Sequence, residues 1–284
     1  AMAEVSVSGQ INMEWTKTEN ATASLNNDLG GDLNTDVFFK GSEDLGNGMK
    51  AGFVIGVSPD GNASAHAWDD QYLTLSGDFG SIKMGQHELF IENKVNAIAA
   101  NDASDSLGNE VTGTTGERAG NSLEYTSPSF NGAKLVLSAR GSATTNDGDF
   151  DGQGVGIDYS NGGLTVRAAQ FDGLNVSSLA AQSTKTEETS VAVKYTMGDF
   201  TVAAANAEVK TASSKTDESW FGVSYKMGNN TISASTRSSE GTSGDDDTFS
   251  VKHAMSKQTS VGITFLNAQA ANSDSAAITV AHKF

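Results

Sequence analysis

Polar and apolar residues alternate strictly near the beginning of the chain. Between residues 5 and 16, six apolar or small side chains from Val5 to Trp15 alternate with six polar ones. Successive side chains of a strand point to opposite faces, so this segment is predicted to be a strand with one apolar and one polar face. Residues 49–57 repeat the pattern, with Phe53 and its apolar neighbours on one face.

The alternation recurs to the end of the chain, whereas helical periodicity is limited to a turn or two around residues 88–100. Three similar hairpins begin at Tyr159, Tyr195 and Tyr225, each with a short turn built from Gly, Asn or Asp. The pattern predicts sixteen strands, at residues 4–17, 35–43, 49–58, 70–77, 81–87, 121–127, 133–140, 153–160, 164–171, 188–196, 200–208, 218–226, 230–237, 247–255, 259–267 and 275–284. Fourteen or eighteen strands also fit the length within boundary error.

Short turns alternate with long polar segments such as residues 173–187 and 238–247. Such alternation is typical of a membrane β-barrel whose two rims face different compartments. Sixteen strands enclose a lumen too wide for side chains to fill, so the polar faces should line water and the apolar faces should contact lipid. At roughly ten residues each, the strands use about 160 residues and leave about 120 for turns and loops. An aromatic girdle is predicted at the short-turn rim, formed by Tyr125, Tyr159, Tyr195 and Tyr225.

Composition narrows the class of protein further. The 284 residues carry 18 Lys and Arg against 35 Asp and Glu, a formal net charge of −17. Such an acidic chain offers no basic stripe for nucleic acid, so no nucleic-acid partner is expected. The absence of Cys excludes disulfides, thiolate metal sites and cysteine nucleophiles. The four His residues lack metal-ligand spacing, and no catalytic motif is present, so no enzyme activity is expected.

The segments that start at Lys40, Leu75 and Asn121, together with the terminal Phe284, resemble landmarks of the general porins of Gram-negative outer membranes, the trimeric kind found in proteobacteria. The segment that starts at Lys40 resembles their second-strand turn, and the one that starts at Leu75 resembles the next hairpin. The segment from Asn121 resembles the hairpin after their constriction loop, and Phe284 resembles their terminal Phe. The landmarks follow the family order and span nearly the whole chain.

The resemblance implies an all-β fold: one transmembrane antiparallel barrel domain over residues 1–284, integral to the bacterial outer membrane. It also implies a homotrimer in contact with membrane lipid and lipopolysaccharide. The third long loop, at residues 88–120, would fold into the lumen and constrict the pore. The family often places Arg on the facing wall, but this chain has none before Arg118. A basic wall must therefore rest on Lys40, Lys50 and Lys83, which the alternation points inward.

The predicted constriction loop is rich in carboxylates. Acidic groups at a narrowing concentrate cations and repel anions, so a cation preference is expected. The alternative is that these are solvated loop charges far from the bore. The candidate acidic constriction residues are Glu88, Glu92, Asp102, Asp105, Glu110 and Glu117.

One segment has the spacing of a calcium-binding loop. Asp147, Asp149 and Asp151 alternate before Gly152, and Asp158 stands at the twelfth position. The alternative is an outer loop that is simply rich in Asp, with no helix to flank an ion site. Calcium at acidic loops is the one possible cofactor; no other is expected.

The sequence thus predicts a porin that passes ions and small hydrophilic solutes by passive diffusion. Two alternatives remain open. One is an outer-membrane channel selective for a particular solute. The other belongs to a different class, a soluble or surface-attached all-β adhesin or lectin that depends on calcium.

Overall fold

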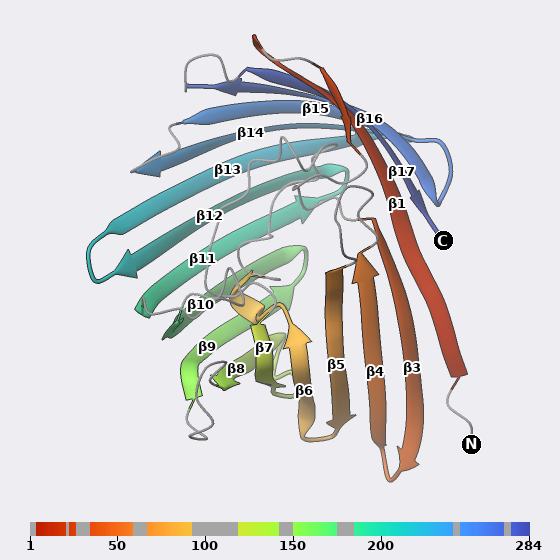
Figure 1. Cartoon of the computed structure of the whole chain (residues 1–284), viewed down its shortest axis with the longest axis vertical. Helices are drawn as coiled ribbons and strands as arrows, with labels where there is room; N and C mark the ends of the chain where they lie inside the picture. The colour runs from red at the N-terminus through yellow and green to blue at the C-terminus, as the bar shows by residue number, and fades with distance from the viewer. Residues whose placement is uncertain are drawn as a thin grey trace.

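The computed structural model shows a single antiparallel sheet that curls round until its first and last long strands pair (Figure 1). The structure describes residues 4–20, 23–26, 35–58, 67–92, 119–141, 150–174, 185–240, 245–269 and 274–284. Each long strand pairs with the long strands next to it in the chain, and β1 lies between β17 and β3. Because both edges of the sheet are used in this closure, none of the long strands that the structure describes is left as an unpaired edge.

Sixteen of the strands are long, and β2 is a three-residue piece that pairs with β1. The strands are β1 (Glu4–Thr18), β2 (Ser24–Asn26), β3 (Asp36–Gly46), β4 (Met49–Ser58), β5 (Ala67–Gly77), β6 (Gly80–His87), β7 (Ala119–Thr126), β8 (Ala133–Gly141), β9 (Phe150–Asn161), β10 (Leu164–Leu174), β11 (Lys185–Met197), β12 (Phe200–Thr211), β13 (Lys215–Met227), β14 (Asn230–Glu240), β15 (Asp246–Ala254), β16 (Thr259–Ala268) and β17 (Ser275–Lys283). The predicted count of sixteen barrel strands is confirmed.

Two of the longest strands run further toward the long-loop rim than the alternation predicts. Strand β11 begins at Lys185, and β13 begins at Lys215, each three residues before its predicted start. These extra residues are mostly polar on both faces, so they carry no apolar alternation. Hydrogen bonding between neighbouring strands, rather than burial of an apolar face, sets where these strands end.

Tight turns join the strands at one rim. Between β3 and β4 the chain turns through Gly46, Asn47 and Gly48, all with positive φ of 78°, 52° and 77°. Gly and Asn adopt this left-handed conformation at little cost, which is why the sequence places them at the short hairpins. In outer-membrane barrels short turns of this kind face the periplasm, so we expect the other rim to be the extracellular one.

The seam of the barrel is closed by the last residue. The N–H of Gly9 donates to the carbonyl of Phe284 at 3.0 Å, and the N–H of Phe284 donates back to the carbonyl of Gly9 at 3.0 Å. A Cβ at position 9 would clash with the backbone oxygen of Asp36 and lie 2.7 Å from the Phe284 ring. Only glycine therefore fits where the terminal ring crosses β1.

The outer face of the barrel is apolar and the inner face is polar. Exposed side chains such as Val7, Ile11, Ile157 and Phe221 alternate with polar residues that are buried or face the lumen. Register places the four girdle tyrosines on the outer face beside the short turns, because each pairs with an outward apolar residue such as Leu137. This arrangement agrees with the predicted aromatic girdle. No helix among the described residues is long and apolar enough to span a membrane.

Candidate functional site

The third long connection begins by turning against the inner wall. After β6, the residues Leu89, Phe90 and Ile91 are almost completely buried, and a helical turn starts at Phe90. The N–H of Glu92 donates to the carbonyl of Leu89 at 3.1 Å, which closes this turn. The helical periodicity expected around residues 88–100 is thus present as far as Glu92, and residues 93–118 lie outside the described part of the chain.

Glu124 of β7 holds this turn in place. Its Oε2 accepts a hydrogen bond from the N–H of Phe90 at 2.7 Å and another from the hydroxyl of Ser138 at 3.1 Å. The ammonium of Lys83 lies 4.0 Å from its Oε1. Register pairs Lys83 with Glu124 and Glu124 with Ser138, so all three side chains project from the same inner face. A buried carboxylate with a charged partner and two donors is a strong fixing point.

The ring of Phe90 packs against the inner wall at Gly156 of β9. A Cβ on Gly156 would lie 2.6 Å from that ring, so only glycine leaves room for it. Ala169 and Phe171 of β10 line the same space together with Ile91. Apolar packing and the bond to Glu124 therefore place the start of this connection inside the barrel rather than at the rim.

Three lysines occupy the inner face of β3, β4 and β6. Lys40 pairs with Val54 and Lys83 with Thr74, both on the polar face, and Lys50 shares the parity of Val54. The ammonium of Lys40 lies 4.7 Å from the Phe38 ring centroid, and that of Lys83 lies 5.1 Å from the Tyr72 centroid. Lys40 and Lys50 are exposed. Their placement agrees with the expected inward direction, whereas a part in ion selection stays a prediction.

The open part of the lumen wall lies along these strands. A groove of about 290 Å³ is lined mainly by inner-face residues, among them Ser6, Lys40, Tyr72 and Thr74. By contrast, inner-face residues of β11 such as Glu188 and Ala192 are almost completely buried. His87 is also buried and packs edge-on against Tyr72, with ring centroids 5.8 Å apart.

The acidic constriction candidates fall into two groups. Glu88 and Glu92 lie at the turn that enters the barrel and are half-buried. Asp102, Asp105, Glu110 and Glu117 lie outside the described residues. The constriction role of all six therefore remains a prediction.

The calcium-loop spacing does not bring its last two members, Asp151 and Asp158, together. Asp151 and Asp158 both lie in β9, seven residues apart on an extended strand, which separates them by about 23 Å. The Nε of Arg167 donates to Oδ1 of Asp158 at 3.1 Å on the inner wall. Asp158 therefore cannot share an ion with Asp151, and the interpretation fails for this residue. Asp147 and Asp149 lie outside the described residues, within which no group of three or more possible metal ligands gathers.

The inner wall also carries ionised residues that were not singled out from the sequence. The guanidinium of Arg237 on β14 pairs with the carboxylate of Asp246 on β15. Hydroxyl groups support the buried carboxylates: Ser239 donates to Glu218 at 3.1 Å, and Thr279 donates to Glu14 at 2.9 Å. The signal was present in the sequence, because each of these residues lies on the polar side of its strand's alternation.

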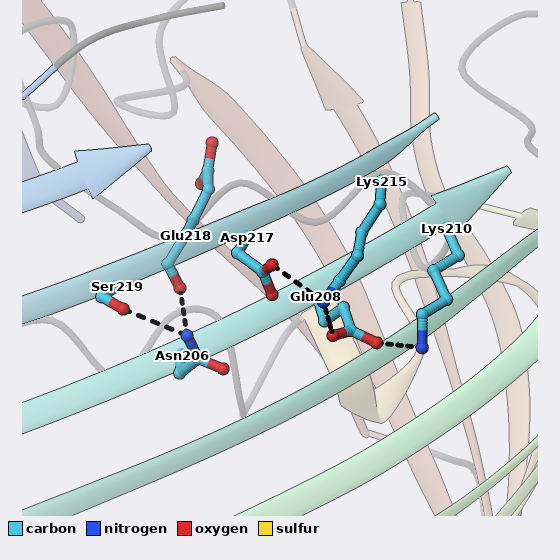
Figure 2. A network of polar contacts seen from close by, with 7 residues as sticks. All are labelled: Asn206, Glu208, Lys210, Lys215, Asp217, Glu218 and Ser219. Carbon is cyan, nitrogen blue, oxygen red and sulfur yellow. Dashed lines mark hydrogen bonds and ion pairs between the residues drawn. The ribbon is translucent and has the colours of Figure 1, made fainter. Parts of the chain in front are cut away.

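A second charged group lies on the outer face of the barrel near the extracellular rim. Figure 2 shows it across β12 and β13: Lys215 bridges Glu208 and Asp217, its Nζ lying 2.6 Å and 3.0 Å from their oxygens. Lys210 also pairs with Glu208, and the side-chain amide of Asn206 donates to the carbonyl of Glu218 at 2.8 Å. These charged pairs give the protruding strand ends a polar outer surface above the apolar band.

Taken together, these features define a class of protein: an outer-membrane β-barrel with an apolar exterior and a polar, charged lumen that a chain segment enters from one side. A family model described as a Gram-negative porin matches residues 1–274. The chain belongs to the Gram-negative porin family, and its location is the bacterial outer membrane.

The individual relatives share only low sequence identity with this chain, and over part of its length. A monosaccharide porin of Halomonas sp is 30% identical over 129 residues, which are 40% of this chain and 34% of the relative. The major outer membrane protein P.IB of Neisseria gonorrhoeae is 28% identical over 189 residues, 61% of this chain and 52% of that protein. The chain thus matches between a third and about half of the length of these relatives. An anion-selective porin from Comamonas acidovorans has the same fold, with a TM-score of 0.75, 20% identity and complete coverage of both chains.

Proposed function

We propose that this protein is a porin that forms a water-filled channel for passive diffusion of ions and small hydrophilic solutes. The observation that carries the proposal is the polar inner face, with exposed Lys50 and with exposed Lys40 lining an open groove, in a barrel whose outer face is apolar. Charged side chains facing the lumen of a wide barrel are stable only in water. Diffusion needs no bond-making residue, and none is assigned.

Swelling of liposomes that contain the purified protein tests this proposal. Vesicles loaded with an impermeant polymer swell when a sugar enters with water, and the rate should fall steadily as the sugar becomes larger. A rate that depends on sugar identity at equal size would favour the solute-selective alternative. Folded, inserted protein that admits none of the sugars would contradict the channel and favour the adhesin alternative.

We infer a preference for cations. The formal net charge of −17 and the carboxylates at Glu88 and Glu92, where the third long connection enters, support it. Lys40, Lys50 and Lys83 oppose it, and their balance with the acidic connection decides the sign. The four acidic candidates further along the connection, Asp102, Asp105, Glu110 and Glu117, are proposed to contribute to the same field.

Neutralising the three lysines should strengthen the cation preference. In the variant Lys40→Gln, Lys50→Gln, Lys83→Gln, the reversal potential under a KCl gradient should move further toward the potassium equilibrium potential, because anions lose their counter-charge on the wall. The matched control is Lys185→Gln, Lys210→Gln, Lys215→Gln, which removes three charges from the outer face and should leave the reversal potential unchanged. An equal shift in both variants would show that the inner lysines do not contact the ion path.

We also propose assembly as a homotrimer, with the terminal strands in the subunit contact. A groove of about 520 Å³ on the outer face supports this placement: it lies across β15, β16, β17 and β1, and its lining includes Phe249, Phe265 and Lys17. Cross-linking in mild detergent should give trimers. Only monomers at all cross-linker concentrations would contradict this proposal.

Lipopolysaccharide is the proposed lipid partner at the extracellular rim. The outer-face charges of β12 and β13 support this proposal, because Lys210 and Lys215 can meet phosphate groups while Glu208 and Asp217 can meet bridging divalent cations (Figure 2). Calcium at the acidic outer loops is proposed in the same role. Dissociation of co-purified lipopolysaccharide by a chelator would support both proposals.

A further inference from the structure

Charged residues on the inner wall are sorted by height along the pore axis. Register follows one inner face around the whole barrel, because paired residues in neighbouring strands point to the same side. Lys83 pairs with Glu124, and the series continues through Ser138 and Gly154 to Phe171 and then Glu188. On the other side of the seam, Thr279 pairs with Glu14. Every strand can therefore be divided into an inner and an outer series.

The periplasmic half of this inner wall is predominantly basic. It comprises the charged inner residues that lie no more than three residues from the short-turn end of their strand. The bases are Lys50, Lys83, Lys134, Arg167, Lys194, Lys226, Lys252 and Lys283. The acids among the described side chains of this zone are Asp44, Glu124 and Asp158.

The extracellular half has the opposite balance. Its charged inner residues lie seven or more residues from the short-turn end, and Lys40 lies between the two zones. The acids include Glu14, Asp36, Glu188, Glu218 and Asp246, and the bases among the described residues are Arg140 and Arg237. Glu14, Glu188 and Glu218 are buried in the wall, and each accepts a hydrogen bond from a hydroxyl group.

The basic zone is open to the lumen. Lys50, Lys134, Lys226 and Lys283 are exposed. Lys226 and Lys252 both pair with Thr231 of β14, so the two ammonium groups stand in one row across three strands. A row of ammonium groups on a low-dielectric wall attracts anions and repels cations locally, just as the carboxylate zone does in the opposite sense.

We propose that this axial separation of charge makes the channel rectify ionic current. The inference rests on the proposed channel function. Anions are the mobile ions of the basic periplasmic zone, and cations are those of the acidic extracellular zone. A voltage that is negative on the periplasmic side drives both kinds of ion toward the middle of the pore, where they accumulate and carry a large current. The opposite voltage draws both away from the middle, so the pore is depleted of ions and conducts less.

The axial separation of charge also makes the entry of a charged solute depend on the side from which it arrives. A cationic solute meets attractive charge first when it arrives from outside, and an anionic solute does so when it arrives from the periplasm. The fields persist over the pore only while salt does not screen them. The Debye length is about 30 Å at 0.01 M salt and about 3 Å at 1 M, so rectification should be strong in dilute salt and absent in concentrated salt.

Single-channel current–voltage curves in symmetrical KCl test the proposal. At 0.01 M, the current at the favoured polarity should exceed that at the opposite polarity about twofold, and the ratio should approach about 1 at 1 M. The chain has no Cys, so Ser213→Cys in the exposed β12–β13 connection gives a unique thiol at the extracellular rim. A bulky thiol reagent that cannot cross the membrane then reports which compartment faces this rim in each recording.

Two variants test whether the inner lysines cause the asymmetry. The triple variant Lys226→Gln, Lys252→Gln, Lys283→Gln should abolish most of it. Lys185→Gln, on the outer face and outside the proposed lipopolysaccharide contact, should retain it. The proposal is overturned if the wild-type current is symmetrical in dilute salt, or if asymmetry has the opposite polarity or survives removal of the three inner lysines. Absence of any current from folded protein would instead contradict the proposed channel function.

Discussion

Valine in place of Gly9 should weaken the barrel at its seam. The added side chain would meet the Phe284 ring and the backbone oxygen of Asp36, so the terminal ring or one of the neighbouring strands must move. Overpacking of this kind costs about 2 kcal/mol, and here it also strains the pair of hydrogen bonds between Gly9 and Phe284. We expect the folded form, detected by its distinct mobility on unheated gels, to be lost at a lower temperature than in the wild type.

A second glycine provides the matched control. Gly120 in β7 has open space where a Cβ would be added, so Gly120→Val should leave the temperature of unfolding nearly unchanged. The variant Phe284→Ala removes the ring and should partly rescue Gly9→Val. An unfolding temperature for Gly9→Val equal to that of the wild type would show that the terminal ring does not pack on β1.

Loss of the Glu124 side chain should free the beginning of the third long connection. The variant Glu124→Ala removes the acceptor for the Phe90 N–H and leaves that buried donor without its partner. A lost hydrogen bond to a charged group costs about 1.5–3 kcal/mol, which is enough to populate a detached state. We expect larger single-channel conductance with frequent transitions between levels, because the segment no longer stays against the wall.

The variant Glu124→Gln separates the two roles of this side chain. Glutamine removes the negative charge beside Lys83 but keeps an oxygen that can accept from Phe90. It should change the reversal potential more than the conductance, whereas Glu124→Ala should change both. Identical conductance and noise in wild type and Glu124→Ala would contradict the anchoring role of this residue.

The fold was largely predictable because side-chain alternation in a barrel depends on local sequence. Strand β1, with its regular sequence from Val5 to Trp15, was predicted to within one residue at its end. The prediction was poorer at the extracellular ends of β11 and β13. There the residues near Lys185 and Lys215 are polar on both faces, and only pairing with a neighbouring strand keeps them extended.

The sequence predicted which side chains line the inner wall, but it did not predict which of them contact the third long connection. The parity of the alternation placed Lys40, Lys50 and Lys83 on the inner face. No local pattern connects Phe90 with Glu124, which are 34 residues apart, because their contact depends on how the barrel closes around the connection. The Asp158 error has the related cause that motif spacing ignores the extended geometry of β9, which carries this carboxylate away to Arg167.

The axial order of charges was present in the sequence but needed the register to be seen. Lys226 and Lys252 are 26 positions apart in the chain, and they share a row only because both pair with Thr231. Composition alone would not predict a basic zone, because the net charge of −17 suggests a uniformly acidic channel. The separation into zones is therefore a property of the closed barrel rather than of its composition.

Planar-bilayer recording of the purified protein under a KCl gradient tests the central claim most directly. We predict stepwise insertion of open channels, in groups of three if the trimer forms, with a reversal potential that favours cations. A reversal potential that favours anions would show that the lysine wall outweighs the acidic connection. Failure of folded protein to conduct at all would contradict the channel itself.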